Sequence, residues 1–235
     1  MYTQFSVAFS TDLGGSNVEG KKVPYLVSIT VNSKPFCGGS IIADRWILTA
    51  AHCFSGNMVK NAAVRVETNN FTASGTLYRI DRAIAHETFF PGAFRDDAGL
   101  LRLRSPLKFG ERVKKIELLL QIVPNNATLT LVGRGSISQD RKKPKITQII
   151  KAKNIALKLC RKMQPDAIYP GHLCTFAKKG KGVCDGDSGG PVVWYGRQVG
   201  IVSWSKGCAA GYSDVHARIS YFLPWIKATI AANSD

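Results

Sequence analysis

The stretch VCDGDSGGP (183–191) places one serine, Ser188, between an aspartate and two glycines. Glycines let a backbone turn sharply and approach another molecule closely. A serine on such a turn presents its hydroxyl, and neighbouring N–H groups can point the same way, which suits a nucleophile beside an oxyanion hole. A lone G-D-S-G is more often a polar turn with a surface serine. The chemistry therefore depends on a base and an orienting acid elsewhere in the chain.

A base and an acid are both available. His52 lies in the apolar segment LTAAHC (48–53), although one histidine in such a segment is more often structural than catalytic. Asp97 opens the apolar run AGLLRL (98–103), where we expect it to be partly buried. A buried carboxylate needs a hydrogen-bond donor, and a histidine ring N–H is a suitable one. With Ser188, these residues predict a base, an orienting acid and a nucleophile in the chain order His, Asp, Ser.

Length and composition favour a sizeable core. The chain has 235 residues, of which 45% are hydrophobic, enough for one large β domain or two small ones with a shared core. No run of 18 or more uncharged apolar residues occurs, so no transmembrane segment is predicted. The opening MYTQFSVAFST has neither a basic start nor a long apolar stretch. It is therefore not interpreted as a signal peptide, and a processed or recombinant form is expected.

The six cysteines indicate the cellular compartment. They lie at positions 37, 53, 160, 174, 184 and 208 and form no C-x-x-C pair, which argues against zinc ribbons and thioredoxin-like sites. An even count favours three disulfides, while spacing alone leaves fifteen connectivities open. Disulfides imply an oxidising compartment, so a secreted, extracellular protein is expected. Glycosylation sequons at Asn70 and Asn126 would fit secretion, although sequons often arise by chance.

The formal net charge of +16 is unusual. Basic residues crowd in RKKPK (141–145), between positions 151 and 162, and in KKGK (178–181). One interpretation is a solvated, solubilising surface, and the other is an anionic partner such as a heparin-like polysaccharide, an acidic lipid or a microbial surface. Nucleic acid is not expected, because no recognition motif appears. The four histidines are scattered and no phosphate loop occurs, so neither a metal nor a cofactor is predicted.

Short β-rich runs with turn signals between them predict an all-β barrel or sandwich. These runs lie at 25–31, 40–50, 62–67, 78–85, 98–103, 128–133, 191–196 and 198–204. Two helices are predicted, one at 154–163 and one at the C-terminus, where Ser220 is expected to cap the helix and Pro224 to lie in its first turn. The polar stretch 105–115 is the best candidate for a linker between two halves of the chain.

Two motifs in this order, TAAHC (49–53) and GDSGGP (186–191), resemble those of the chymotrypsin-like (trypsin-fold) serine protease family. FCGGSII (36–42), GIVSW (200–204) and a terminal helix with a tryptophan agree with the family pattern, and the resemblance runs from about residue 12. The stretch HLCTFAKKGKGVCDGDSGGP (172–191) looks most like insect chymotrypsins.

This resemblance implies an all-β fold of two six-stranded antiparallel β-barrels packed around a central cleft, with a C-terminal helix. The N-terminal barrel would span 12–110 and carry His52 and Asp97, the C-terminal barrel 111–219 would carry Ser188, and the helix 220–235 would complete one peptidase domain. The implied disulfides, each contributing about 2–4 kcal/mol, are Cys37–Cys53, Cys160–Cys174 and Cys184–Cys208.

The resemblance also implies a secreted serine endopeptidase that works through an acyl-enzyme. Ser188 would attack the scissile carbonyl, His52 would take its proton, and Asp97 would orient His52. The N–H groups of Gly186 and Ser188 would form the oxyanion hole, at about 3–4 kcal/mol per donor. The expected partners are protein or peptide substrates and protease inhibitors, and the chain is expected to be a monomer.

The specificity pocket is expected to be apolar. At its base, where trypsins carry aspartate, the chain has Gly182 followed by Val183, which argues against a preference for Lys or Arg. Ser205 and Asp214 replace residues that are often glycine, which should shorten the pocket, whereas a carboxylate at Asp214 would attract a basic residue. A chymotrypsin- or elastase-like preference is expected. The full set of predicted pocket residues is Gly182, Val183, Ser203, Trp204, Ser205 and Asp214.

Two departures from the family pattern affect activation. Family members become active when cleavage after Arg or Lys frees an Ile-Val-Gly-Gly terminus, whose amine pairs with the aspartate before the serine, here Asp187. In this chain Asp12 begins the corresponding stretch DLGG, and no Lys or Arg precedes Lys21. The family's G-W-G reads G-R-G around Arg134. These departures leave an alternative: a weakly active or inactive homologue that acts as a basic binding protein for anionic glycans or microbial surfaces.

Overall fold

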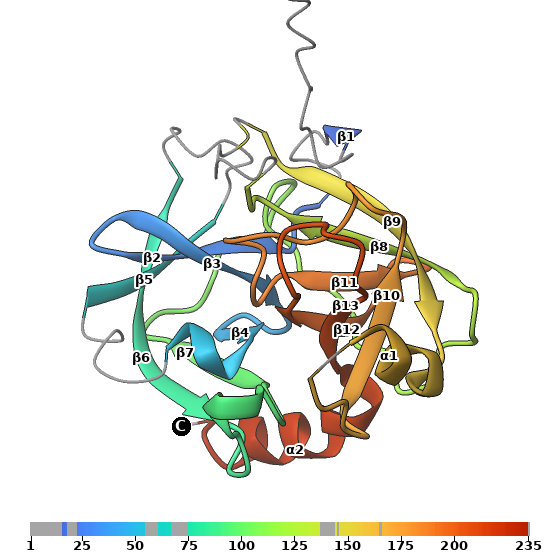
Figure 1. The fold of residues 1–235 in the computed structure, drawn as a ribbon. Coiled ribbons are helices and arrows are strands. Elements are labelled where there is room, and N and C mark those ends of the chain that lie inside the picture. Colours follow the sequence, from blue (N-terminus) through green and yellow to red (C-terminus); the bar gives the residue numbers. More distant parts are fainter. Residues whose placement is uncertain are drawn as a thin grey trace, which may run out of the picture.

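The computed structural model describes residues 16–17, 23–54, 61–66, 75–136, 144, 146–164 and 166–234. Within them the chain forms two β-barrels and a C-terminal helix that lies beneath them in the view of Figure 1. Asp12, the sequon at Asn70 and the basic residues 141–143 and 145 lie outside the described residues.

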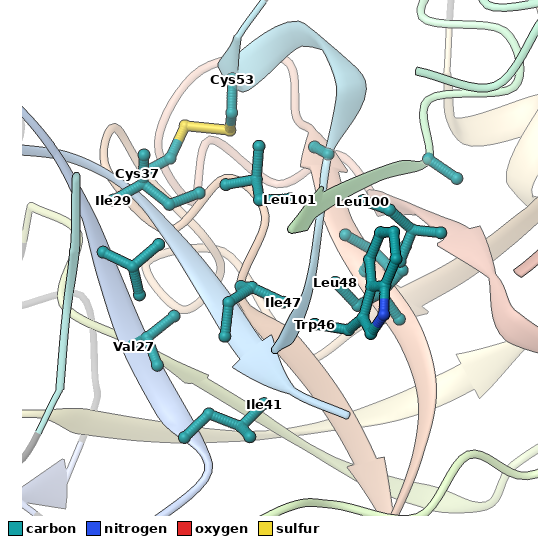
Figure 2. Close-up of a cluster of buried hydrophobic side chains, with 14 of the residues drawn as sticks. Val27, Ile29, Cys37, Ile41, Trp46, Ile47, Leu48, Cys53, Leu100 and Leu101 are labelled. Atoms are coloured by element: carbon teal, nitrogen blue, oxygen red, sulfur yellow. A yellow bond between two sulfur atoms is a disulfide. The ribbon is translucent and has the colours of Figure 1, made fainter. Parts of the chain in front are cut away.

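The first barrel is closed by six antiparallel strands in the order β2-β3-β4-β7-β6-β5. Its centre is apolar because the paired strands β4 and β7 are buried on both faces: Ile47, Leu48, Leu100 and Leu101 have no exposed surface. Figure 2 shows these side chains packed together beside Trp46. The strands are β2 (Leu26–Val31), β3 (Lys34–Ile41), β4 (Trp46–Thr49), β5 (Ala62–Arg65), β6 (Leu77–Ala85) and β7 (Gly99–Leu103).

The second barrel is built from the C-terminal half of the chain. Its strands follow the order β9-β10-β13-β12-β11-β8, the pairing of β8 with β9 closes the ring, and β1 (Ser16–Asn17) pairs with β9 from outside. These strands are β8 (Thr128–Gly133), β9 (Gln148–Ile155), β10 (His172–Phe176), β11 (Pro191–Trp194), β12 (Arg197–Trp204) and β13 (Asp214–Arg218). The expected fold of two six-stranded antiparallel barrels with a C-terminal helix is confirmed.

Three local predictions were wrong in detail. The run 40–50 is not one strand, because it turns between β3 and β4. Helix α1 (Leu157–Met163) begins later than residue 154, since Asn154 still belongs to β9 and donates its buried side-chain amide to Val123 O and Pro124 O. Helix α2 (Ile219–Ala231) begins before Ser220, so Arg218 takes the N-cap position without a side-chain cap and Pro224 lies inside the helix.

The described residues contain three disulfides, in the pairing that the resemblance implies. Cys37–Cys53 joins β3 to the segment after β4, Cys160–Cys174 joins α1 to β10, and Cys184–Cys208 joins two loops of the second barrel. None of the helices in the described part of the chain is long and apolar enough to cross a membrane.

The two barrels touch closely at the loop that carries Ser188. Gly189 has a φ of +79°, and a Cβ there would lie 2.1 Å from Thr49 Oγ1 of the first barrel. Gly38 N donates to Ser188 O at 2.7 Å, which ties β3 to the same loop. Glycine is therefore required at position 189 both by its backbone angle and by the space available.

We expect the core of the first barrel to dominate its stability. Ile47→Ala should lower the free energy of unfolding by about 2–5 kcal/mol, because Ile47 is fully buried and its truncation leaves a cavity. The matched change Ile122→Ala, at a side chain that is 75% exposed, should cost less than about 0.5 kcal/mol. Denaturant unfolding with the disulfides intact measures both values, and equal losses would contradict this view of the core.

Candidate active site

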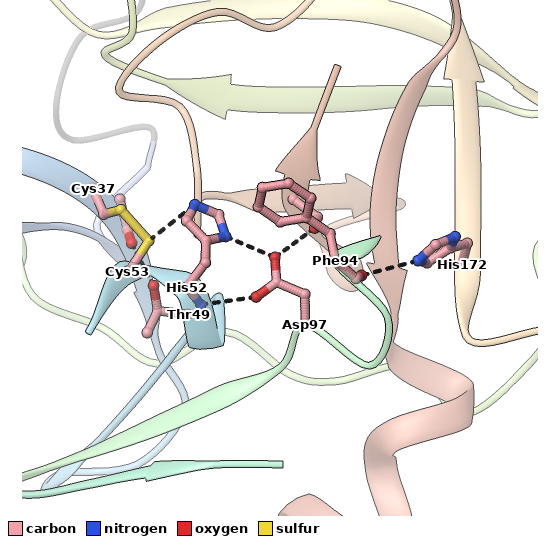
Figure 3. A network of polar contacts seen from close by, with 9 residues as sticks. Cys37, Thr49, His52, Cys53, Phe94, Asp97 and His172 are labelled. Atoms are coloured by element: carbon pink, nitrogen blue, oxygen red, sulfur yellow. Dashed lines mark hydrogen bonds and ion pairs between the residues drawn. A yellow bond between two sulfur atoms is a disulfide. The ribbon is translucent and has the colours of Figure 1, made fainter. Parts of the chain in front are cut away.

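His52 and Asp97 are brought together by the pairing of β4 with β7. His52 lies in the short 3-10 turn η2 (Ala51–Cys53) directly after β4, and Asp97 lies two residues before β7. Because Thr49 pairs with Gly99 at that end of the strands, the two functional residues face each other. Asp97 Oδ1 accepts from His52 N at 2.9 Å, and Asp97 Oδ2 lies 2.7 Å from His52 Nδ1, as Figure 3 shows.

The Asp97 carboxylate also accepts a hydrogen bond from the second barrel. Ser203, in β12, donates its hydroxyl to Asp97 Oδ2 at 2.5 Å. The Asp97 side chain is 1% exposed, so these donors replace the water that a buried carboxylate loses. A carboxylate beside Nδ1 favours the tautomer that carries its proton there, which leaves Nε2 as an acceptor. His52 is thereby arranged with Nε2, the nitrogen that could accept a proton, facing away from Asp97.

Ser188 lies on a tight turn that opens into the same pocket as His52. Asp187 N donates to Cys184 O at 3.0 Å, and Gly186 has a φ of +96°, a conformation that glycine adopts without strain. Among the described residues, neither the Gly186 N–H nor the Ser188 N–H donates to a protein acceptor. The structure thus places the three residues His52, Asp97 and Ser188 at one site between the barrels.

Asp187 holds this turn against the end of β8. Its Oδ1 accepts from Gly135 N at 2.6 Å and its Oδ2 accepts from Cys184 N at 3.0 Å. A Cβ at Gly133 would lie 1.9 Å from Asp187 Oδ1, and one at Gly135 would lie 2.4 Å from the same carboxyl group. The glycines around Arg134 therefore make room for Asp187. The G-R-G departure was visible in the sequence, but the packing of Asp187 against it was not predicted. The two glycines, Gly133 and Gly135, were the signal that could have indicated this packing.

The predicted pocket residues fall into two groups. Val183, Ser203, Trp204 and Ser205 line the pocket beside Ser188. Gly182 and Asp214 lie behind this lining: Val183 N donates to Asp214 Oδ2 at 3.2 Å, and a Cβ at Gly182 would lie 3.0 Å from the same oxygen. Sequence reasoning did not find the other residues of the pocket wall, which include Phe94, Asp185 and Lys206.

Asp214 is uncharged at neutral pH. Its pKa is raised to about 8, chiefly by burial; the hydrogen bond from Val183 N opposes the rise, and the nearby charge of Asp187 adds to it. Because the carboxyl is only 4% exposed, its proton is retained well above the pH at which an exposed aspartate ionises. The back of the pocket is therefore polar but neutral at pH 7.

One cluster among the described residues has metal-ligand types within reach of each other, namely Cys37, His52 and Cys53. Both cysteines of this cluster are joined in a disulfide, so they offer no thiolate. His52 itself is engaged by Asp97. The chemistry of this cluster therefore fits a base near a nucleophile better than a metal centre.

Comparisons with known proteins agree with this geometry. A family model described as Trypsin matches residues 12–226. The chain is 36% identical to trypsin V-B of Rattus norvegicus over 227 residues, covering 94% of this chain and 90% of the relative. It is 32% identical to chymotrypsin-2 of Vespa crabro over 216 residues, covering 92% and 98%. The solved structure of neuropsin, a serine protease of mouse brain, superposes with a TM-score of 0.86 at 26% identity, covering 92% and 99%.

The chain therefore belongs to the trypsin family of serine proteases. The expected likeness to insect chymotrypsins is present, but mammalian trypsins match at similar or higher identity. Membership of a protease family implies peptide substrates, and disulfide-bonded trypsin homologues are typically secreted.

The neutral Asp214 carboxyl predicts a specific pH dependence of stability. Its pKa is about 8 in the folded chain against 3.8 for the unperturbed group, so between these values the folded state binds more protons and the free energy of unfolding falls as pH rises. The slope approaches about 1.4 kcal/mol per pH unit. Urea unfolding at pH 5 and pH 8 should show wild type losing stability relative to Asp214→Asn, which cannot ionise. A constant difference between the two proteins at both pH values would contradict the prediction.

Proposed function

We propose that the chain is a secreted serine endopeptidase that cleaves peptide bonds through an acyl-enzyme on Ser188. The observation that carries the proposal is the set of hydrogen bonds around Asp97, which orients His52 in the pocket that Ser188 also lines. A histidine held by a buried carboxylate beside a serine is the arrangement that activates a hydroxyl nucleophile.

The proposed reaction uses each residue in turn. His52 Nε2 takes the proton of the Ser188 hydroxyl as its oxygen attacks the scissile carbonyl carbon. The buried Asp97 carboxylate stabilises the positive charge that then develops on the imidazole. His52 passes the proton to the departing amine, and a water molecule activated in the same way later releases the acyl group from Ser188.

We infer that the oxyanion hole is formed by the N–H groups of Gly186 and Ser188. Both lie on the turn that Asp187 holds through Gly135 and Cys184, and both are free of acceptors among the residues that the structure describes. Preorganised donors of this kind stabilise the tetrahedral intermediate, because they need no reorganisation when charge develops. Asp187 would thus order the oxyanion hole. We also propose that the amine of an activated terminus near Asp12 pairs with Asp187; Asp12 lies outside the described residues.

The proposed preference is for medium-sized apolar side chains before the scissile bond. Gly182 supplies no charge at the back of the pocket, and Asp214 is protonated at pH 7. The side chains of Val183 and Ser205 on the wall narrow the space. A neutral, narrowed pocket favours Leu, Met or Phe over the charged ends of Lys and Arg, because burial of an unpaired charge is costly.

A second candidate is a binding protein for anionic polysaccharides or microbial surfaces. Its support is a group of lysines of which one, Lys206, lines the pocket. Lys178 and Lys181 pair across a turn, and the side chain of Lys179 lies against Gly211. Lys178, Lys179 and Lys206 are exposed, and none of the four forms an ion pair with another described residue. Such a surface attracts polyanions whether or not the site is catalytic.

Labelling by a fluorophosphonate separates these two functions. Wild type should bind one equivalent covalently at Ser188 and hydrolyse peptides, because His52 and Asp97 activate that hydroxyl. Ser188→Ala should take up none and lose hydrolysis by a factor of about 10⁶, while its melting temperature stays within a few degrees of wild type. Absence of labelling in wild type would favour the binding protein, and equal hydrolysis by the variant would remove the protease assignment.

The pocket should change its preference with pH. At pH 6, cleavage of a peptide library should be dominated by Leu, Met and Phe before the scissile bond, because Asp214 is protonated. At pH 9, above its pKa of about 8, the ionised carboxylate should raise the share of Lys and Arg at least several-fold. Asp214→Asn should show no such rise. A profile dominated by basic residues already at pH 6 would contradict a neutral Asp214.

A further inference from the structure

Arg134 carries a buried charge with no acidic partner among the described residues. Its side chain is 7% exposed, Nε donates to Thr147 Oγ1 at 2.9 Å, and Nη1 donates to Ser28 Oγ at 3.0 Å. No carboxylate pairs with it among the residues that the structure describes. Burial lowers the pKa of this guanidinium to about 10, which shows how poorly the charge is compensated. A buried cation is normally paired, so an anion is the natural missing partner.

Arg134 lines a small cavity between residues of the two barrels. Ser28, which accepts from Nη1, lines this cavity together with Arg134, Phe36, Cys37 and Gly186. A guanidinium has five N–H donors in a fixed fork, and two bonds to hydroxyls leave the rest available. Nη2 of Arg134 has no hydrogen-bond partner among the described residues and is not fully enclosed by protein. Its N–H donors therefore remain accessible to a ligand.

The position of this cavity relative to His52 fixes which part of a substrate would reach it. Under the proposed mechanism, the departing amine takes its proton from His52 Nε2. That nitrogen lies 3.8 Å from Cys53 Sγ, and Cys53 is bonded to Cys37, as Figure 3 shows. Cys37 in turn lines the cavity. The pocket that would hold the acyl side chain is lined by the other side of the Ser188 turn. The cavity therefore lies on the leaving-group side of the scissile bond.

We propose that Arg134 recognises an acidic side chain at one of the first two positions after the scissile bond, and so makes the enzyme selective on its leaving-group side. The inference rests on the endopeptidase function proposed above. The carboxylate would approach past Phe36, whose side chain is 42% exposed at the cavity, and accept charge-assisted hydrogen bonds from the free donors of Arg134. A neutral amide of the same shape would leave the guanidinium charge uncompensated.

Acyl transfer tests this site without changing the acyl pocket. An N-blocked phenylalanine ethyl ester first acylates Ser188, and dipeptide amides then compete with water for the acyl-enzyme. The dipeptide amine attacks the acyl carbon, a C–N bond forms, the C–O bond to Ser188 breaks, and the amine proton passes through His52 to Ser188 Oγ. The ratio of peptide to hydrolysis product, measured by chromatography, reports binding on the leaving-group side alone.

Matched nucleophiles isolate the charge. The acidic pair is Ala-Glu amide and Glu-Ala amide, and the neutral pair is Ala-Gln amide and Gln-Ala amide. In wild type we expect one acidic nucleophile to outcompete its neutral match by about tenfold or more, the effect of a hydrogen bond to a charged group. Arg134→Gln should bring the ratio close to one and Arg134→Lys should retain part of it. Arg197→Gln, which removes one exposed positive charge elsewhere, should behave as wild type.

Each contrary result has a distinct meaning. Wild type that hydrolyses the ester but shows equal ratios overturns the role of Arg134 and leaves the protease assignment intact, even if Arg134→Gln fails to fold. A preference that survives in Arg134→Gln also overturns it. A tenfold ratio in chloride-free buffer that vanishes in 0.1 M chloride would show that the site takes a free anion instead. Absence of ester turnover would remove the proposed function, and this inference with it.

Discussion

The buried carboxylate of Asp97 is the interaction on which the site depends. It accepts from His52 twice and from Ser203 once, and these donors come from different barrels. A charge with 1% exposure is stable only where such donors are fixed in place. The orientation of His52 is therefore set by the way the barrels pack together as well as by the loop that carries the histidine.

The barrels must consequently meet with little freedom, and the structure shows how this is achieved. Gly189 lies so close to Thr49 that no side chain fits between them, and Gly38 N bonds to Ser188 O. Farther along the interface, the buried hydroxyl of Ser40 donates to Gln198 Oε1 at 2.7 Å. Each contact joins β3 or β4 of the first barrel to the segment from 188 to 198 in the second. Ser188 is thus positioned relative to His52 by close contacts that tolerate little displacement.

The sequence predicted the parts of this site that short motifs encode. TAAHC and GDSGGP pointed to His52 and Ser188, and the apolar run pointed to Asp97. The fold brings these three residues together, and their catalytic roles stay predictions. The strand runs were located well wherever apolar and β-branched residues alternate with turns. Motifs and strand runs do not report on contacts between distant segments. Only the fold shows that some predicted pocket residues line the pocket, whereas Gly182 and Asp214 lie behind this lining.

The same limit explains the errors at element ends. Asn154 has the sequence context of a helix, but tertiary hydrogen bonds to Val123 and Pro124 hold it in a strand. Ser220 has the residue type of a cap, yet the helix starts before it. Arg134 was recognised as unusual, but its two hydroxyl partners lie 106 and 13 residues away and could not be read from neighbouring positions.

Two consecutive peptide groups behind the pocket link parts of the site that would otherwise be separate. Val183 N bonds to Asp214, Cys184 N bonds to Asp187, and Cys184 is also bridged to Cys208 on the pocket wall. A displacement of this short segment would therefore disturb the pocket and the nucleophile turn together. Occupancy of the pocket and order in the turn are thermodynamically linked, so any ligand that fits the first must stabilise the second by the same coupling free energy. In this molecule, the pocket and the turn that carries Ser188 share one piece of backbone.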